Sequence, residues 1–321
     1  MSTRDSGSPS VAKQLPPVVD SVSELIGRTP LLRLGRFEPE NRAEIFAKLE
    51  LYNPGGSVKD RLGVGLVENA EKRGDLQPGG TIVEPTAGNT GIGLALVGIQ
   101  KGYRVILVVP ENFSVEKVKL MEVLGGEIIR TPGDLGMKGA IERAGEIVAE
   151  IGESAYMPNQ FFNDDNSSVH YETTGPEIWE QMDERVDALA IGAGTSGTFT
   201  GVARFLKEKN PDLHSVVVEP NGSILQGGEP GPHKVEGIGV SFIPGIFDRD
   251  LVDEVIMVHD DDAFATVREL ARTESLMAGG SGGANLCAAL QIARRLGPGK
   301  RVVTVIPDSA ERYISKGHLD S

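Results

Sequence analysis

Lys59 is the residue whose type and position point most directly to chemistry. It follows the turn-forming run Asn-Pro-Gly-Gly-Ser at 53–57, in which Ser57 is predicted to cap a helix that carries residues 61–70. A lysine in the first turn of a helix opposes the helix dipole. A lysine held in such a place acts as a nucleophile or a base once it is neutral. On these residues alone, an exposed and solvated lysine remains the alternative.

Three glycine-rich turns each follow an expected strand and open an expected helix, at 84–96, 191–201 and 277–285. The first offers free amides, hydroxyls and a carboxamide at a helix N-terminus, which suits a carboxylate or a phosphate. The second presents amides and three hydroxyls without a lysine, and it matches neither the Walker A loop nor the dinucleotide GxGxxG spacing. Each alone is as consistent with an ordinary tight turn. Together they predict one ligand crevice at the carboxyl ends of parallel strands.

The elements expected to position these residues alternate along the chain. Short β-branched runs without apolar–polar alternation predict strands buried on both faces, at 81–85, 104–110, 127–132, 188–194, 214–220 and 301–307. Helix-period stretches lie between them, at 114–125, 138–152, 196–210, 262–274 and 283–296. This alternation predicts an α/β fold with doubly wound sheets. The turn-rich segment 219–239 is a functional candidate, because it is long for a connection in a compact domain.

Composition excludes several classes of partner. The 321 residues include 46 Asp and Glu against 32 Lys and Arg, and the net charge of −14 repels nucleic-acid backbones and anionic membranes. A single cysteine, Cys287, rules out a disulfide within the chain, and no Cys/His cluster has metal-ligand spacing. No apolar run is long enough to span a bilayer. Residues 1–18 lack the apolar core of a signal peptide, which predicts a disordered tail on a cytoplasmic protein.

Five motifs in order carry a family resemblance: "NPGGSVKDR", "EPTAGNTGIGLA", "GAGTSGTFTG", "KVEGIGVSFIP" and "GGSGGA". Together they resemble the pyridoxal-phosphate-dependent cysteine synthase / cystathionine β-synthase family, from about Ser23 to Lys316, and most closely its bacterial members that use O-acetylserine. The resemblance implies fold type II, with two doubly wound, mostly parallel α/β domains. It places a smaller, mobile domain at 55–160 and a larger, cofactor-anchoring domain at 19–54 plus 161–321.

The resemblance also implies roles for residues at matching positions. Lys59 resembles the lysine that forms the Schiff base with pyridoxal phosphate and then moves the substrate's Cα proton. Asn89 resembles the residue that binds the cofactor's 3′ oxygen, and Ser281 the serine that faces its pyridine nitrogen. The cup for the cofactor phosphate corresponds to Gly194, Thr195, Ser196, Gly197 and Thr198. The substrate-binding residues correspond to Thr86, Ala87, Asn89, Thr90 and Gln160, with Gly237 and Gly239 at the mouth.

Two positions depart from the common family pattern. Ala87 stands where many relatives carry a serine, which removes one donor from the carboxylate loop. Ser196 replaces a glycine of the phosphate cup, which adds a hydroxyl. Neither departure removes an essential function. A serine rather than an aspartate at the ring nitrogen does not enforce ring protonation, which favours loss of a β leaving group over transamination.

The resemblance therefore implies β-replacement on O-acetyl-L-serine or serine through an aminoacrylate intermediate. Sulfide as the second substrate gives L-cysteine, and homocysteine gives L-cystathionine. A serine/threonine dehydratase is one alternative, against which the motifs TAGNTG and KVEGIG argue. A pseudo-enzyme that serves as a partner-binding module is another, against which intact Lys59, Asn89 and Ser281 argue. A homodimer is expected, without a metal, haem or adenosylmethionine control.

Overall fold

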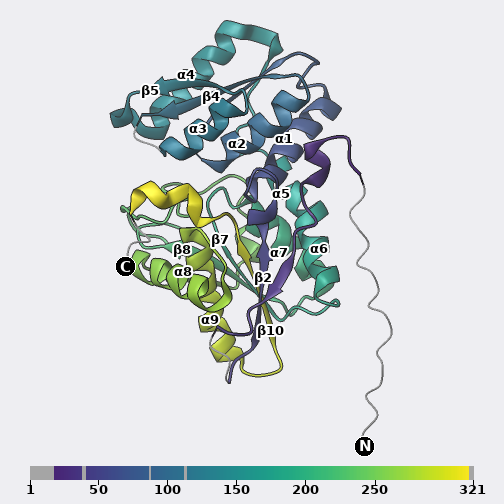
Figure 1. Ribbon diagram of the computed structural model, residues 1–321, viewed down its shortest axis with the longest axis vertical. Coiled ribbons are helices and arrows are strands. Elements are labelled where there is room, and N and C mark those ends of the chain that lie inside the picture. The colour runs from purple at the N-terminus through teal and green to yellow at the C-terminus, as the bar shows by residue number, and fades with distance from the viewer. Residues whose placement is uncertain (1–17, 38–40, 87, 112–113, 318–321) are drawn as a thin grey trace, which may run out of the picture.

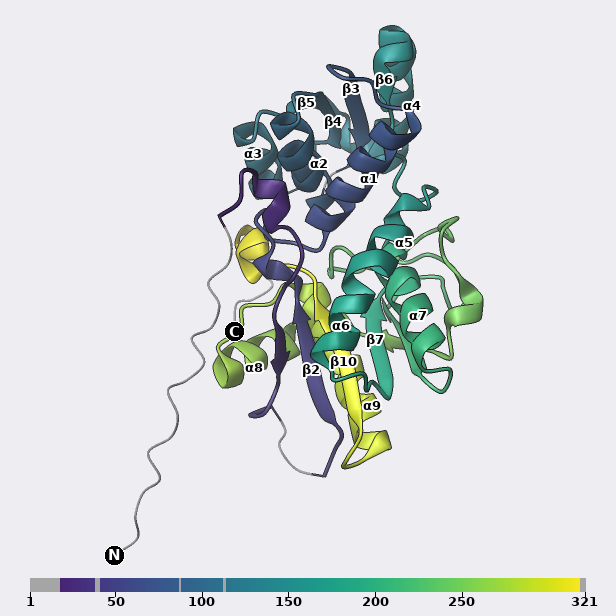
Figure 2. The same ribbon diagram turned by 90° about the vertical axis from the view of Figure 1, so that its right-hand side faces the viewer.

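The computed structural model describes residues 18–37, 41–86, 88–111 and 114–317. Its helices and strands form two lobes, each built around its own sheet (Figure 1). A view from the side shows that α5 (Asp165–Val169) lies where the two lobes meet (Figure 2). The helices that begin at the three glycine-rich turns therefore pack on two separate sheets.

The larger sheet has six strands in the order β1–β2–β10–β7–β8–β9. Their bounds are Leu31–Arg33, Glu44–Leu49, Arg301–Ile306, Ala188–Gly192, His214–Pro220 and Glu254–Val258. All neighbouring strands are parallel except β1 and β2, which are antiparallel. Val216 and Val218 pack into an apolar cluster with α9 (Gly280–Leu296), whereas Val217 between them packs with α7 (Gly197–Lys209) on the other face. The sheet is thus buried on both faces, as its unbroken apolar strands predict.

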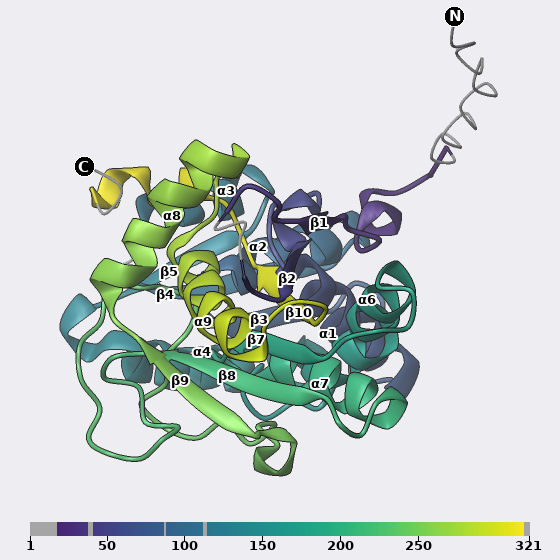
Figure 3. The same ribbon diagram turned by 90° about the horizontal axis from the view of Figure 1, so that it is seen from below.

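Helices cover the larger sheet from two sides, which is visible from below (Figure 3). α8 (Asp260–Glu274) packs with α9 on one face, and α6 (Gly175–Gln181) packs with α7 on the other. Because helices cover both sides, this lobe has the doubly wound architecture that the sequence predicts.

The smaller sheet has four parallel strands in the order β5–β4–β3–β6. Their bounds are Glu127–Thr131, Arg104–Pro110, Thr81–Pro85 and Ala155–Tyr156. One apolar cluster joins this sheet to α1 (Lys59–Arg73) and α2 (Asn89–Gln100). Another joins its opposite face to α4 (Gly136–Ile151). This sheet too is covered on both faces.

The remaining helices are short. α3 (Val115–Val123) lies beside α2, and α5 continues through η5 (His170–Thr174), a π-helical turn, into α6. The 3-10 helices are η1 (Val22–Leu25), η2 (Glu50–Tyr52), η3 (Gly133–Leu135), η4 (Gly152–Ser154), η6 (Arg249–Leu251) and η7 (Ala310–Lys316). η7 follows β10 of the larger sheet and lies against α3 of the smaller lobe. The end of the described chain therefore crosses from one lobe to the other.

Two glycines set how closely α1 approaches α2. A Cβ on Gly63 would lie 2.5 Å from the carbonyl oxygen of Gly93, and a Cβ on Gly93 would lie 2.4 Å from the carbonyl oxygen of Lys59. No side chain fits at such separations, so only glycine permits this crossing. The N-termini of the two helices, which begin at Lys59 and Asn89, are held side by side as a result.

Buried charges fix α1 against the larger lobe. The Nε of Arg61 lies 2.7 Å from Glu50 Oε2, and its Nη1 lies 2.7 Å from Glu177 Oε1. Lys48 of β2 completes the network with a 2.7 Å ion pair to Glu177. Removing one partner of a buried pair costs about 3–5 kcal/mol. The start of α1, and Lys59 with it, is therefore held against the larger lobe.

The structure contains every strand that the sequence predicts, and none loses more than two residues from its end. The prediction missed β1, β2, β6 and β9. The predicted cap of α1 was wrong. Val58 occupies the N-cap position, and the Oγ of Ser57 accepts the N–H of Lys59 at 3.2 Å instead. The domain bounds at 55 and 160 stay a prediction, and the expected tail falls largely on residues 1–17, outside the described residues. No helix in the described ranges combines the length and apolar character that a bilayer crossing requires.

Candidate active site

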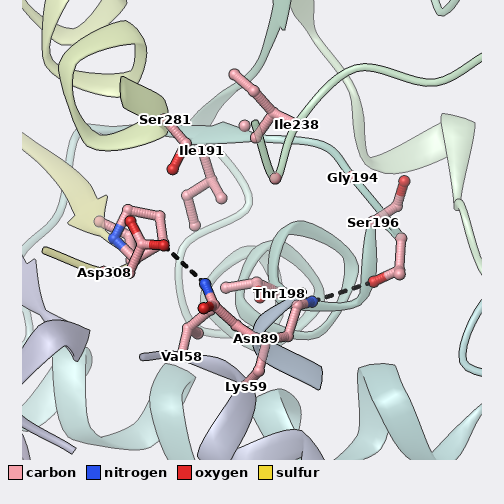
Figure 4. Close-up of a pocket in the computed structure, with 15 residues that line it drawn as sticks. Val58, Lys59, Asn89, Ile191, Gly194, Ser196, Thr198, Ile238, Ser281 and Asp308 are labelled. Atoms are coloured by element: carbon pink, nitrogen blue, oxygen red, sulfur yellow. Dashed lines mark hydrogen bonds between the residues drawn. The ribbon is translucent and has the colours of Figure 1, made fainter. Parts of the chain in front are cut away.

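The three glycine-rich turns meet in one cavity between the two lobes (Figure 4). Lys59 and Asn89 reach it from the N-termini of α1 and α2, and Ser281 reaches it from the first turn of α9. β7 and β10 end at its wall, through Gly192 and Pro307. The cavity lies at the carboxyl ends of parallel strands, where α/β sheets place their ligands.

Lys59 lies in the wall of this cavity and is only partly exposed. The surrounding protein keeps water away from its ammonium group, and this desolvation lowers the pKa of Lys59 to about 8. Its Nζ donates a hydrogen bond of 3.4 Å to Thr195 Oγ1 (Figure 4). At a pH near 8 about half of the lysine is neutral, which is the form that attacks a carbonyl or removes a proton.

The turn before α7 has the features of an anion site. Ser196, the N-cap of α7, adopts φ +72°, and its buried Oγ has no hydrogen-bond partner among the described residues. Gly197 leaves no room for a side chain, since its Cβ would lie 1.9 Å from Asn166 Oδ1. Thr198 Oγ1 lies 3.1 Å from Nε2 of His170, whose pKa burial lowers well below its usual value, so the ring is neutral. The free amides and hydroxyls at this helix N-terminus suit a phosphate.

The Asn89 carboxamide and the Ser281 hydroxyl also point into this cavity (Figure 4). Asn89 Nδ2 donates to Asp308 Oδ2 at 2.7 Å, and Arg312 Nη1 donates to Asn89 Oδ1 at 2.6 Å. Ser281 is nearly fully buried. Both groups are neutral, and the titratable side chains that line the cavity with them are Lys59 and Asp308.

A wider cavity of about 410 Å³ adjoins the first and shares Lys59 and Asn89 with it. Thr86, Thr90 and Gln160 line it. Thr90 Oγ1 donates to Gln160 Oε1 at 2.7 Å. The side-chain amide of Gln160 also donates a hydrogen bond to the Glu84 carboxyl group. Because Nε2 carries two N–H groups, one of them remains to donate to an acceptor such as a carboxylate.

The mouth of the wider cavity is formed by glycines and one ion pair. Gly237 and Gly239 have φ of +88° and +89°, a region that favours glycine. A Cβ on Gly239 would lie 2.5 Å from His233 Nε2. Lys117 of α3 is nearly fully buried, and its Nζ lies 2.8 Å from Glu236 Oε2. This pair joins the smaller lobe to the loop of the larger lobe across the mouth.

The sequence-predicted site residues line these two cavities, with two exceptions. Ala87 lies outside the described residues, and Gly197 packs behind the cup. The structure adds residues to which the sequence assigned no role, namely Lys117, Asn166, His170, Asp308 and Arg312. The last two stand in the run "IPDSAERY" at 306–313, which begins at the end of a predicted strand, so their position in the sequence was a signal although their contacts were not.

Residues 22–308 match a family model described as pyridoxal-phosphate dependent enzyme. The chain belongs to this family. The O-acetylserine dependent cystathionine beta-synthase of Bacillus subtilis (strain 168) is 51% identical over 299 residues, which are 93% of this chain and 97% of that relative. The cysteine synthase of Staphylococcus aureus (strain Mu50 / ATCC 700699) is 46% identical over 92% of this chain and 96% of that relative. The crystal structure of the O-acetylserine dependent cystathionine beta-synthase from Helicobacter pylori has a TM-score of 0.90 and 45% identity, and covers 94% of this chain and 99% of its own.

This pyridoxal-phosphate dependent enzyme therefore has the fold type II architecture and an activity of the cysteine synthase / cystathionine β-synthase type. The cavity fits the cofactor. Lys59 has a lowered pKa, and the unpartnered hydroxyl of Ser196 at the start of α7 meets the need of a phosphate for donors. The family membership that the motifs predict is confirmed.

Proposed function

We propose that this enzyme catalyses β-replacement on O-acetyl-L-serine and that the residues identified from the sequence form its site. The Bacillus subtilis and Helicobacter pylori relatives depend on O-acetylserine. Acetate is a better leaving group than hydroxide, so we expect O-acetylserine to be preferred over serine. The observation that carries the proposal is the place of Lys59. It lies where the anion cup at the start of α7 meets the wider cavity that contains Gln160.

Pyridoxal phosphate, when bound, supplies an electron sink for the negative charge that forms at the substrate's Cα. Lys59 is placed to hold the cofactor, and then to take and return the Cα proton, because it lines both cavities. Gln160 and Thr86 are placed to hold the substrate carboxylate from the wider cavity. Ser281 presents a neutral hydroxyl to the cavity, and a neutral partner at the ring nitrogen would not enforce its protonation.

We assign the second substrate to the mouth of the wider cavity. A volume of about 410 Å³ lies within the range of small-molecule sites, so an amino acid fits in addition to sulfide. Lys117 and Glu236 present a cation and an anion 2.8 Å apart at this mouth. Homocysteine carries a carboxylate and an ammonium group that match these charges. We therefore expect both cysteine and cystathionine as products.

A competition assay tests this assignment. Sulfide and homocysteine compete for turnover, with O-acetylserine, serine and O-phosphoserine as donors. We expect the highest kcat/KM with O-acetylserine and measurable amounts of both products. Glu236→Gln should lower kcat/KM for homocysteine by about tenfold, which corresponds to about 1.4 kcal/mol, and should change the sulfide reaction much less. Glu229→Gln on the same loop, an exposed site outside the cavity lining, is the matched control.

The same assay distinguishes the alternatives. A dehydratase would release pyruvate from the donor at a rate that no added nucleophile changes. A pseudo-enzyme that binds partners would turn over no donor at all. If sulfide reacted readily and homocysteine did not react, the enzyme would be a dedicated cysteine synthase.

A homodimer belongs to the same proposal. An apolar groove of about 820 Å³ is lined by Tyr52, Leu120, Val123 and Met277, all of which are exposed. Exposed apolar patches of this kind mark interaction surfaces. Sedimentation velocity should therefore give twice the mass of one chain, and Val123→Glu should give the mass of one chain. A monomeric wild-type protein would contradict this part of the proposal.

A further inference from the structure

The two hydrogen bonds of the Asn89 side chain determine how its carboxamide is oriented. Its Oδ1 accepts from Arg312 Nη1 at 2.6 Å, and its Nδ2 donates to Asp308 Oδ2 at 2.7 Å. A guanidinium group only donates and a carboxylate only accepts. Turning the carboxamide over would bring donor against donor and acceptor against acceptor. One orientation is therefore enforced, and it leaves the second N–H of Nδ2 for the cavity.

Asp308 and Arg312 are themselves held in place. Both are nearly fully buried. Asp308 forms an antiparallel bridge with Ser57, and the hydroxyl of Tyr313 donates to the same carboxylate oxygen as Asn89. Arg312 also donates through Nη2 to the carbonyl oxygen of Gly55. The segment that holds Asn89 is thus tied to the turn that precedes Lys59.

The other carboxylate oxygen of Asp308 is enclosed by the protein. Oδ1 is buried and has no hydrogen-bond partner among the described residues. Asp308 lines the same cavity as Asn89 and Ser281 (Figure 4). A Cβ on Gly279 would lie 2.1 Å from Oδ1, so this oxygen packs against Gly279. The Asp308 carboxylate is therefore confined by packing on one side and holds Asn89 through Oδ2 on the other.

We propose that Asp308 and Arg312 are positioning residues, which turn the Asn89 carboxamide so that it donates to the cofactor. The inference rests on the proposed cofactor contact of Asn89. It also has a consequence for the two lobes. Asp308 and Arg312 follow β10 of the larger sheet, whereas Asn89 begins α2 of the smaller lobe. The same hydrogen bonds therefore hold the smaller lobe over the cavity.

A double-mutant cycle between Asn89→Ala and Arg312→Met tests the proposal. Pyridoxal phosphate is removed from each purified protein and titrated back, and the visible absorbance of the bound cofactor gives the dissociation constant. Arg312→Met should weaken binding about three- to tenfold when Asn89 is present, as expected for one well-placed hydrogen bond. It should weaken binding much less when residue 89 is alanine. The pH at which the cofactor absorbance changes should shift in the same direction in both single variants.

Four further variants sharpen the result. Arg312→Lys keeps a cation and one donor, so it should recover part of the affinity that Arg312→Met loses. Asp308→Asn keeps an acceptor for Asn89 and should bind the cofactor more tightly than Asp308→Leu. Arg104→Met removes an exposed arginine that pairs with Glu127 on the smaller lobe, and it controls for the loss of an arginine as such.

The possible failures are distinguishable. If Arg312→Met weakened binding equally in both backgrounds, Arg312 would act through Gly55 or through folding, and the positioning role would be overturned. Equal affinities of Asp308→Asn and Asp308→Leu would overturn it as well. If the wild-type protein took up no pyridoxal phosphate at Lys59, the proposed function itself would fail.

Discussion

Replacing Glu84 with glutamine should change how the free energy of unfolding depends on pH. Glu84 is the penultimate residue of β3 and its side chain is buried, and the backbone N–H of Asn159 donates to its Oε2 at 3.0 Å. Burial raises the pKa of Glu84 from 4.5 to about 7, and hydrogen bonds from Asn159 and Gln160 oppose this rise only in part. The carboxyl group therefore supports the turn that carries Gln160 while it resists ionisation.

The size of the effect follows from this shift. A difference of about 2.5 pKa units at about 1.4 kcal/mol per unit corresponds to about 3.5 kcal/mol. Because the folded-state pKa is raised, this contribution to stability is fully present below the unfolded pKa of 4.5 and is lost as the pH rises through about 7. Part of it has gone by about pH 5. The wild-type protein should therefore lose about 2.5 kcal/mol between about pH 5 and about pH 8 that Glu84→Gln does not lose.

Urea unfolding of both proteins across this pH range measures the difference. Asp60, whose pKa burial also raises to about 7, is present in both proteins, so its contribution cancels. Glu127→Gln is the control, because Arg104 lowers the pKa of this half-exposed carboxylate. Its effect should be small and opposite in sign. If the stability difference between Glu84→Gln and the wild type did not vary with pH, the reasoning about Glu84 would be refuted.

Three further predictions concern the cup and the substrate site. Gly197→Asp should abolish cofactor binding in an absorbance titration, because a side chain collides with Asn166 and a carboxylate repels the phosphate. Ser196→Gly should stabilise the cofactor-free protein by about 1 kcal/mol in thermal unfolding, because it relieves a left-handed serine, while it weakens cofactor binding about threefold. Gln160→Ala should raise KM for the donor and leave the resting cofactor spectrum unchanged, and a changed spectrum with an unchanged KM would contradict its assignment.

Local sequence patterns predicted much of the fold for a physical reason. Strands such as β4 (Arg104–Pro110) and β8 are unbroken β-branched runs, which suit burial on both faces of a parallel sheet. β2 escaped prediction because it contains Lys48, which reads as a surface residue. Lys48 is fully buried because it pairs with Glu177, which is far away in the sequence. A tertiary ion pair of this kind leaves no local pattern.

The candidate site likewise has residues that the sequence predicted and residues that only the structure brings together. The turns around Lys59, Asn89 and the start of α7 were visible because glycine and hydroxyl residues follow strands. The contacts that their supporting residues make were not visible in the sequence. His170, in η5, lies within hydrogen-bond distance of Thr198, at the start of α7. Arg312, in η7 near the C-terminus, donates a hydrogen bond to Asn89. Motif spacing shows where a ligand binds, whereas folding decides which side chains orient the groups that bind it.

Borohydride reduction followed by peptide mapping tests the central claim most directly. The claim is that Lys59 holds pyridoxal phosphate and moves the substrate's proton, because desolvation lowers its pKa and leaves part of it neutral. We predict that the reduced cofactor is attached to Lys59, and that Lys59→Ala folds, yields no reduced adduct and loses nearly all turnover. Attachment of the cofactor to another lysine, or substantial turnover by Lys59→Ala, would contradict the account.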